Sequence, residues 1–169
     1  MTVHFFSDLH ITSPQDRAYQ PFLSVLRDKV LPGDTLVLAG DIFDLFIGSK
    51  VFFSDQYSEF FKILRALSER QVSIFYIEGN HDFHMRKALS EIPSLRRFDA
   101  DFEFEVAGKR FYVAHGDLSD QSDWKYLTWR KIVRSPIAKI FLNLTPSRWL
   151  SYLGIKMSEK SRAQKPLML

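Results

Sequence analysis

Short apolar runs that end at polar strings constrain the fold of this chain more than any other feature. The runs 35–39 and 72–77 are nearly continuous in apolar residues, which is typical of strands buried on both faces of a parallel sheet. Helical spacing of apolar residues at 17–30 and 56–70 places a helix before each of these strands. With a first strand at 3–7, this alternation of strand and helix predicts an α/β protein with right-handed crossovers.

The second half of the chain has a different residue pattern and composition. Apolar and acidic residues alternate in 101–106, which together with 109–114 predicts an antiparallel hairpin. Segment 124–169 mixes aromatic and basic residues and contains ten Lys or Arg against one acid, whereas the rest of the chain contains 13 basic and 19 acidic residues. We therefore divide the chain into a core, 1–123, and a basic helical cap, 124–169, that faces an anionic partner. An ordinary solvated helical face is the alternative for the cap.

Composition excludes several classes of protein. A length of 169 residues suits one domain with a sizeable core. The absence of cysteine excludes disulfides and thiolate metal sites and is typical of a cytosolic chain. No uncharged apolar run approaches the roughly 18 residues that span a bilayer. We therefore expect a globular protein of the cytoplasm.

The polar strings at the strand ends carry the candidate metal ligands. Asp8 and His10 follow the first strand, Asp41 the second, Asn80 the third and His115 the hairpin. Ligands of open α/β sheets bind at the carboxyl ends of the strands, so we expect these side chains to converge. Carboxylate and amide oxygens together with imidazole nitrogens suit two divalent transition ions. Each string alone is weak evidence for a metal site, because Asp is also common in turns.

His81 and Asp82 are the candidate catalytic residues. His81 directly follows Asn80 and is expected to point away from it, toward a substrate phosphate rather than an ion. Asp82 is expected to orient the His81 imidazole and to raise its pKa, as the third member of a catalytic triad does. A hydrogen-bonded buried histidine is the alternative for His81. Asp44 is expected to hydrogen-bond within its own loop rather than to bind metal.

The ordered set of strings resembles the calcineurin-like metallophosphoesterases, whose pattern is Asp-x-His, then Gly-Asp, then Gly-Asn-His-Asp, then a His before a Gly. This resemblance implies a layered α-β-β-α sandwich with a helical cap, and a metal-dependent hydrolase. It places His81 at the phosphoryl group as an acid or charge stabiliser, oriented by Asp82. It also implies two metal positions that share a carboxylate, with ligands Asp8 and His10 for the first, Asn80 and His115 for the second and Asp41 for both.

A narrower resemblance is to the UDP-2,3-diacylglucosamine pyrophosphohydrolases of lipid A biosynthesis. The string 40–48 looks like a loop of that family, and so does His115-Gly116-Asp117 with the residues that follow it. The resemblance implies hydrolysis of UDP-2,3-diacylglucosamine to UMP and diacylglucosamine 1-phosphate, with Mn²⁺ as the expected ion and Fe or Zn as alternatives. One branch of the family has Arg where this chain has His81. The substrate-binding residues that the resemblance implies are Asp123, Tyr126, Arg130, Ser161 and Arg162.

The partners expected from this resemblance are a nucleotide-linked lipid and an anionic membrane surface. The cap would shelter the acyl chains and dock on the cytoplasmic face of the inner membrane, to which the protein would be peripherally associated. Nucleic acid is not an expected partner, because the chain contains no recognised nucleic-acid-binding motif. No oligomeric state is predicted.

One part of the family pattern has no counterpart in this sequence. The family ends with a Gly-His-x-His string that gives each metal one more ligand, and no histidine follows His115 here. We therefore expect the C-terminal strands to be missing and the chain to be a fragment of a longer protein, with a natural short form that binds metal weakly as the alternative. The competing functions are hydrolysis of another phosphodiester or phosphomonoester, and binding of phosphate or membrane without catalysis.

Overall fold

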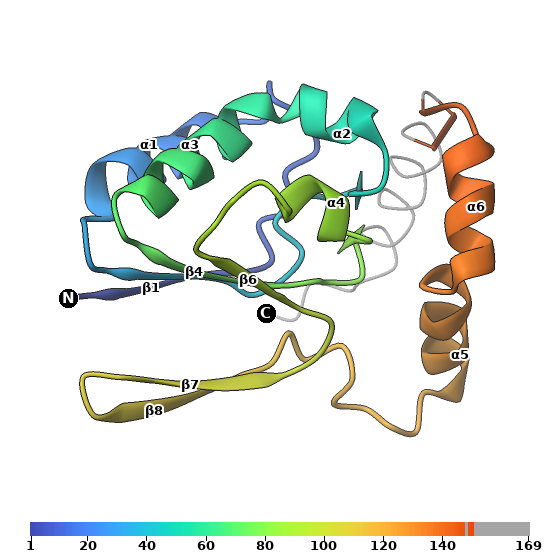
Figure 1. Cartoon of the computed structure of the whole chain (residues 1–169). Coiled ribbons are helices and arrows are strands. Elements are labelled where there is room, and N and C mark those ends of the chain that lie inside the picture. The colour runs from blue at the N-terminus through green and yellow to red at the C-terminus, as the bar shows by residue number, and fades with distance from the viewer. Residues whose placement is uncertain (148, 151–169) are drawn as a thin grey trace, which may run out of the picture.

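Four parallel strands form the sheet that carries the candidate site (Figure 1). The computed structural model describes residues 1–147 and 149–150. The sheet has the order β1-β2-β4-β6. Its strands are β1 (Val3–Phe6), β2 (Thr35–Leu38), β4 (Ser73–Ile77) and β6 (Leu95–Phe98). Phe6 is in register with Leu38, and Leu38 with Tyr76, so the carboxyl ends of the first three strands lie side by side.

Helices cover one face of this sheet, above it in Figure 1. They are α1 (Tyr19–Lys29), α2 (Val51–Gln56), α3 (Ser58–Glu69) and α4 (Arg86–Leu89). Both α1 and α3 are amphipathic, and Leu26 and Leu64 on their inner faces are fully buried. The Phe22 and Phe60 rings stack with their centroids 6.0 Å apart and join the two helices. This apolar layer packs the helices against the sheet.

An antiparallel hairpin covers the opposite face of the sheet. Its strands are β7 (Phe102–Val106) and β8 (Lys109–Val113). Phe98 stacks on Phe102 with ring centroids 3.9 Å apart, and Phe102 lies 5.2 Å from Phe75 in the sheet. Because both faces are covered, β2 is buried along its whole length.

Two helices that we call the cap stand beside the carboxyl ends of the strands (Figure 1). They are α5 (Trp124–Val133) and α6 (Pro136–Leu144). The Asp123 side chain accepts from the Tyr126 amide at the start of α5, and the Ser135 hydroxyl accepts from the Ala138 amide at the start of α6. Neither helix contains a buried residue. A pair of two-residue strands, β3 (Phe46–Ile47) and β5 (Asp82–Phe83), lies between the cap and the helical layer.

The predicted α/β class is confirmed, and the predicted hairpin is present. The described residues supply three of the four expected layers, namely helices, parallel sheet and hairpin. Several short elements were not predicted, namely β3, α2, β5, α4 and the edge strand β6, which carries two arginines. The helical cap was expected to extend to residue 169, and residues 148 and 151–169 lie outside the described part of the chain. No helix within the described part of the chain is long and apolar enough to cross a bilayer.

Candidate metal centre

The loops that leave the first two strands adopt an unusual backbone conformation. Asp8, His10 and Asp41 have φ values of 55°, 48° and 53° in the left-handed region, which costs a residue with a Cβ about 1 kcal/mol or more. Two hydrogen bonds hold the loops together: the Asp8 amide donates to the Gly40 carbonyl over 3.1 Å, and the His10 amide donates to the Asp41 carbonyl over 3.0 Å. The surrounding fold therefore stabilises a strained backbone where all three side chains are metal-donor candidates.

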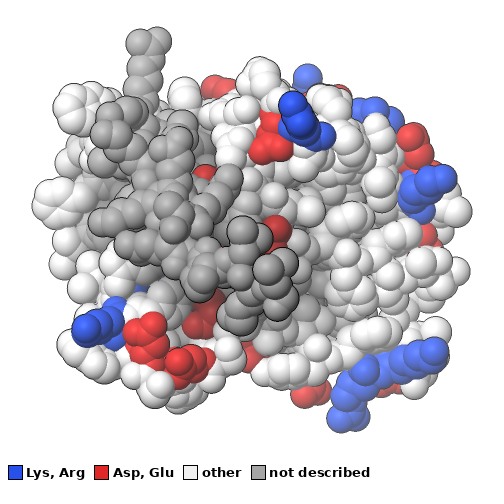
Figure 2. All heavy atoms as spheres, turned by 180° about the vertical axis from the view of Figure 1, so that it is seen from behind, with Lys and Arg blue, Asp and Glu red and all other residues white. Residues whose placement is uncertain are grey.

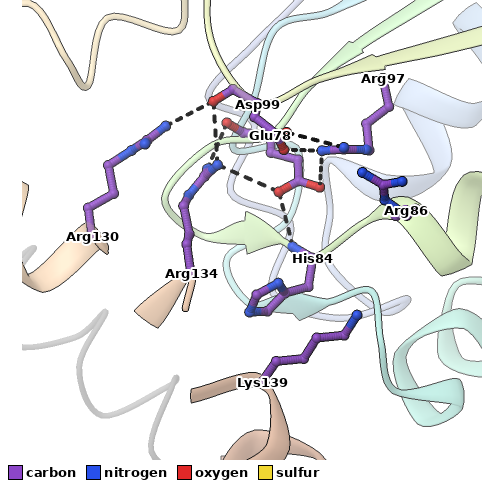
Figure 3. Close-up of a pocket in the computed structure, with 8 residues that line it drawn as sticks. All are labelled: Glu78, His84, Arg86, Arg97, Asp99, Arg130, Arg134 and Lys139. Carbon is purple, nitrogen blue, oxygen red and sulfur yellow. Dashed lines mark hydrogen bonds and ion pairs between the residues drawn. The ribbon is translucent and has the colours of Figure 1, made fainter. Parts of the chain in front are cut away.

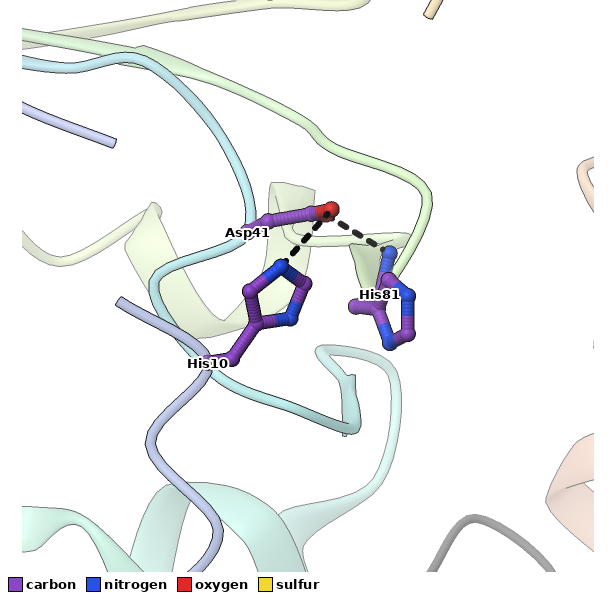
Figure 4. A group of neighbouring side chains, drawn as sticks. All are labelled: His10, Asp41 and His81. Carbon is purple, nitrogen blue, oxygen red and sulfur yellow. Dashed lines mark hydrogen bonds and ion pairs between the residues drawn. The ribbon is translucent and has the colours of Figure 1, made fainter. Parts of the chain in front are cut away.

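Asp41 lies at the centre of the cluster and is 3% exposed. Its Oδ2 is 3.9 Å from His10 Nε2 and its Oδ1 accepts from the His81 amide over 2.9 Å (Figure 4). The same Oδ2 is 3.4 Å from His115 Nε2. Burial raises the pKa of this carboxyl, but hydrogen bonds from His115 and the His81 amide outweigh burial and hold the pKa below its usual value. Asp41 is therefore a carboxylate at neutral pH.

Two groups of donor atoms meet at this carboxylate. His10, Asp41 and His81 form one, Asp8, Asp41 and His115 form the other, and in each the donor atoms lie within 4.8 Å of one another. Asp41 belongs to both, which is the geometry that a bridging ligand requires. The grouping differs from the expected one, because His81 shares a group with His10 and Asp8 shares one with His115.

Asn80 joins the same cluster through its amide oxygen. Its Oδ1 is 3.3 Å from Nε2 of His115, which is the nitrogen that also faces Asp41. The five predicted metal ligands therefore converge at one edge of the sheet, and their role as ligands remains a proposal.

Hydrogen bonds fix the tautomers of two histidines. Nδ1 of His115 lies 2.9 Å from the Ala39 carbonyl, and Nδ1 of His81 lies 2.7 Å from the Asp44 carbonyl. A carbonyl only accepts, so in both rings Nδ1 carries a proton and Nε2 is the nitrogen that can face a metal ion or a substrate.

The donor set fits divalent cations of the transition series. Burial lowers the pKa of His10, which favours the neutral imidazole that binds metal. Burial would also lower the pKa of His115, but the hydrogen bond to Asp41 outweighs it and raises the pKa to about 9. A proton on His115 therefore balances a carboxylate that a metal ion would neutralise. Oxygen and imidazole donors of this kind suit Mn, Fe or Zn rather than a soft ion.

Two glycines give the cluster its close packing. Gly40 has φ of 89°, and a Cβ there would lie 2.5 Å from Nδ1 of His115. A Cβ on Gly79 would clash with Oδ1 of Asp41. Any side chain at either position would displace a metal-donor candidate.

The structure corrects the expected contact between Asp82 and the His81 ring. The Asp82 carboxylate is fully buried and accepts from the amides of Asp41, Ile42 and Gly79 over 3.1, 2.8 and 2.8 Å, and from the Tyr76 hydroxyl over 2.7 Å. Burial and the nearby Asp41 charge raise the pKa of Asp82 to about 7. The His81 ring instead bonds to the Asp44 carbonyl, so Asp82 positions the two glycine-containing loops and not the imidazole.

Two of the substrate-binding candidates within the described residues, Tyr126 and Arg130, share the partner Asp117. Its Oδ2 accepts from the Tyr126 hydroxyl over 2.8 Å and from Nε of Arg130 over 2.6 Å. Asp123 lies one residue before α5 and caps that helix, while Ser161 and Arg162 lie outside the described residues. Sequence reasoning quoted Asp117 as part of a string but missed its role as the common acceptor, for which the sequence has no local signal.

A second arginine of the cap that sequence reasoning did not single out reaches the core. Arg134 donates through Nη2 to the carbonyl oxygens of Glu78 and Gly79 over 3.1 and 2.8 Å. It therefore holds the end of α5 against the loop that presents Asn80 and His81.

Comparison with known proteins agrees with this geometry. The family described as calcineurin-like phosphoesterase matches residues 1–162. A protein of Serratia proteamaculans named UDP-2,3-diacylglucosamine hydrolase is 28% identical over 166 residues, covering 96% of this chain and 67% of that protein. The protein of that name in Photorhabdus laumondii is 29% identical over 164 residues, with 96% and 68% covered. The chain thus spans about two thirds of the length of these relatives.

A solved structure from Aquifex aeolicus, described as a protein of unknown function, aligns with a TM-score of 0.46 at 22% identity and covers 79% of this chain and 73% of its own. That likeness is too distant to add to the sequence matches. The family match and the hydrolase relatives confirm the prediction of a metal-dependent hydrolase, and the chain belongs to the calcineurin-like phosphoesterase family.

Proposed function

We propose that the protein hydrolyses the pyrophosphate bond of UDP-2,3-diacylglucosamine and releases UMP and diacylglucosamine 1-phosphate. The observation that carries this proposal is the position of the shared Asp41 cluster beside a cap with an apolar hollow. That hollow has a volume of about 850 Å³ and is lined by α5 and α6 residues that include Ile132, Ile137 and Phe141. A site that combines a phosphoryl-binding centre with an apolar cleft suits a substrate with a charged and an acylated half.

Residues of the core would carry the chemistry. Asp41 would bridge two divalent ions, with Mn²⁺ first and Fe or Zn as alternatives, and the other ligands would be Asp8, His10, Asn80 and His115. Such ions polarise phosphoryl oxygens and lower the pKa of bound water. His81 keeps its Nδ1 proton on the Asp44 carbonyl, which leaves Nε2 to hold or deliver a proton at the reacting phosphate. Its edge-on packing against His10, with ring centroids 4.8 Å apart, fixes the imidazole in that orientation.

Residues of the cap would hold the substrate and the membrane. Arg130 and Tyr126 are oriented by Asp117 and would contact the nucleotide or sugar, together with Asp123, Ser161 and Arg162. Large apolar side chains on both helices are exposed, among them Trp129 (41%), Ile140 (60%) and Phe141 (67%). Aromatic and aliphatic surface next to lysine and arginine is typical of helices that lie on an anionic membrane. This supports peripheral association with the cytoplasmic side of the inner membrane.

The test is metal-dependent release of UMP from UDP-2,3-diacylglucosamine by this chain. Asp8→Ala should abolish turnover without unfolding the protein, because Asp8 is exposed and lies in a loop. Asp28→Ala, which removes an equally exposed carboxylate on α1, is the matched control and should leave turnover unchanged. Turnover that survives in Asp8→Ala would exclude the proposed centre.

A second candidate is binding of the substrate class without turnover. Each donor group in the described residues offers three side chains, and one of these is shared. Divalent transition ions commonly use four or more ligands, so affinity could fall below what catalysis needs. A soluble phosphodiester, bis(p-nitrophenyl) phosphate, separates the candidates. Hydrolysis of this compound alone indicates a different substrate, and binding of Mn²⁺ without hydrolysis of either compound indicates a binding module.

A further inference from the structure

A polar pocket outside the metal centre lies between the core and the cap (Figure 3). Its volume is about 310 Å³. The core contributes one wall, and the end of α5 together with the first turn of α6 contributes the other, so that arginines reach toward the middle from opposite sides in Figure 3. The residues that line it are Glu78, His84, Arg86, Arg97, Asp99, Arg130, Arg134 and Lys139. None of the metal-donor candidates is among them.

The pocket has an excess of positive charge. Four arginines and one lysine face two carboxylates, and Asp117 outside the lining pairs with Arg130, which leaves a net charge of +2 when His84 is neutral. Burial lowers the pKa of His84, so this histidine is neutral at pH 7. Two positive charges in excess around so small a volume repel each other, and a bound anion would relieve that repulsion.

Both carboxylates are already occupied by partners within the protein. Glu78 is 3% exposed and accepts from the amides of His84 and Met85 over 3.1 and 2.8 Å, and from Nη1 of Arg97 over 2.9 Å. Asp99 pairs with the same Arg97 guanidinium. Within the described residues, Arg86 and Lys139 form no ion pair of this kind. Two cations of the pocket are therefore left for a ligand.

The close approach of Arg130 and Arg134 also favours an anion in the pocket. Burial lowers the pKa of Arg134, and the neighbouring Arg130 charge lowers it further. On the face of the molecule shown in Figure 2, the described lysines and arginines stand instead in small separate groups, several of them next to acids. The pocket is a local concentration of cations.

We propose that this pocket binds a phosphate-class oxyanion that ties the cap to the core. Guanidinium groups present paired N–H donors that match the oxygens of a phosphate, and Arg86 on α4 and Lys139 on α6 would close the site from opposite sides. A volume of about 310 Å³ leaves room for one phosphate group and its immediate substituent. The site is separate from the metal centre, because the Gly79 peptide, whose carbonyl accepts from Arg134, lies between them.

The anion has two possible sources, free phosphate and a phospholipid headgroup. A headgroup is compatible with the surroundings, because Lys139 is adjacent to Ala138 and Ile140, and Ala138 lines the apolar hollow of the cap. Both sources present the same chemistry to the arginines.

The test is titration of the ¹⁵N-labelled chain, loaded with diamagnetic Mg²⁺, with inorganic phosphate. Amide signals of residues 84, 86, 97 and 99 report the pocket, and those of 8, 10 and 41 report the metal centre, so the two binding events are read separately. The double variant Arg86→Gln/Lys139→Gln should weaken the pocket response at least about tenfold, because two charge-assisted contacts are lost. Lys109→Gln/Arg110→Gln is the matched control, because it removes the same charge from exposed positions on β8 and should leave the response unchanged.

Vesicles of phosphatidylethanolamine with phosphatidic acid distinguish the two sources. If the double variant weakens vesicle binding more than the control variant does, the anion is a lipid headgroup. If it weakens phosphate binding alone, the anion is free phosphate. If phosphate does not perturb the pocket signals, or if both variants weaken the response equally, the proposal is wrong. Turnover of bis(p-nitrophenyl) phosphate should be the same in both variants, which keeps this result independent of the metal centre.

Discussion

The strand-end cluster of the core and the cap beside it are built on opposite principles. In the core, a buried carboxylate, a left-handed backbone and two close-packed glycines hold the donor side chains where the parallel strands end. In the cap, neither α5 nor α6 buries a residue, and the described contacts to the core combine the partly buried Val133 and Leu142 with hydrogen bonds such as Arg134 to Gly79 and Lys50 to Thr145.

This difference separates chemistry from substrate capture. Phosphoryl transfer needs donor atoms held to within a fraction of an ångström, which a packed sheet provides. Acyl chains and a membrane surface need an adaptable apolar area, which a lightly anchored helix pair provides. Substitutions of the metal-donor candidates should therefore change activity toward every substrate, and substitutions of the exposed apolar residues of the cap should change activity toward lipids alone.

The largest effect is expected for Asp41→Asn. The change keeps the size of the side chain and removes the charge that both donor groups share. Even partners that only contact a metal ligand alter affinity or activity by 10- to 100-fold, so this substitution should lower turnover and Mn²⁺ affinity by more than about 100-fold. Calorimetric titration with Mn²⁺ measures the affinity. Asp28→Asn on α1 is the control, and a loss of less than tenfold at Asp41 would contradict a bridging role.

Asp82→Asn should weaken the hydrogen bonds that hold the loops of the strand-end cluster in the core. The amide NH₂ of asparagine would face backbone N–H groups that now donate to a carboxylate, so at least one buried donor would lose its acceptor. We expect a loss of about 2–3 kcal/mol in the free energy of unfolding, measured with urea. Tyr76→Phe, which removes only the hydroxyl contact to the same carboxylate, should cost about 1 kcal/mol. An unchanged urea midpoint in Asp82→Asn would show that the carboxylate does not support the loops.

The fate of Asp82 shows where sequence reasoning stops. The runs 35–39 and 72–77 predicted β2 and β4 because a strand buried on both faces consists of consecutive apolar residues, which are visible in the sequence. The partners of Asp82 are the amides of Asp41 and Ile42, which are about 40 positions away in the chain, and no spacing rule connects them. The sequence was enough to predict that the donor residues meet where the strands end. It was not enough to predict the hydrogen bonds that hold these loops in place.

The same limit applies in the cap. Aromatic and basic residues predicted helices there, and α5 and α6 are present. Pairing of Arg130 with Asp117 and of Arg134 with the Gly79 carbonyl depends on how the cap is placed against the core, which local pattern does not encode. Edge strand β6 was missed for a related reason, because Arg96 and Arg97 hide an apolar pattern that only tertiary packing reveals.

Ile140→Ser/Phe141→Ser tests whether the exposed apolar side chains of the cap act on lipid substrates alone. Both side chains are exposed, at 60% and 67%, so their loss should leave the free energy of unfolding within about 0.5 kcal/mol of its original value. Removing two large apolar groups should weaken binding to anionic vesicles, and turnover of the diacylated substrate, at least about tenfold. Hydrolysis of bis(p-nitrophenyl) phosphate should not change. Leu31→Ser/Val51→Ser, at exposed apolar positions of the core, is the control, and equal losses in the two double variants would exclude a special role of the cap.

The smallest effect concerns Asp34, a buried carboxylate of the core that lies away from the site. It accepts from the Thr2 amide over 2.6 Å, the Leu31 amide over 3.0 Å and Nε2 of His4 over 3.0 Å. Burial raises its pKa, but these hydrogen bonds outweigh burial and lower the pKa from 3.8 to about 2. Because the folded protein holds this proton more weakly than the unfolded chain, the stabilisation is complete above about pH 4 and is lost as the pH falls toward 2.

Asp34→Asn should therefore cost roughly 1–2 kcal/mol in the free energy of unfolding at pH 7, and the difference from the original protein should shrink below pH 4. Urea unfolding at a series of pH values measures both. Because Asp34 contacts none of the metal-donor candidates, turnover per folded molecule at pH 7 should be unchanged, unlike that of Asp41→Asn. A difference in stability that stays constant down to pH 2 would show that the carboxylate charge is not what the three donors stabilise. A change in turnover would show that the strand-end cluster is less independent of the rest of the core than its packing indicates.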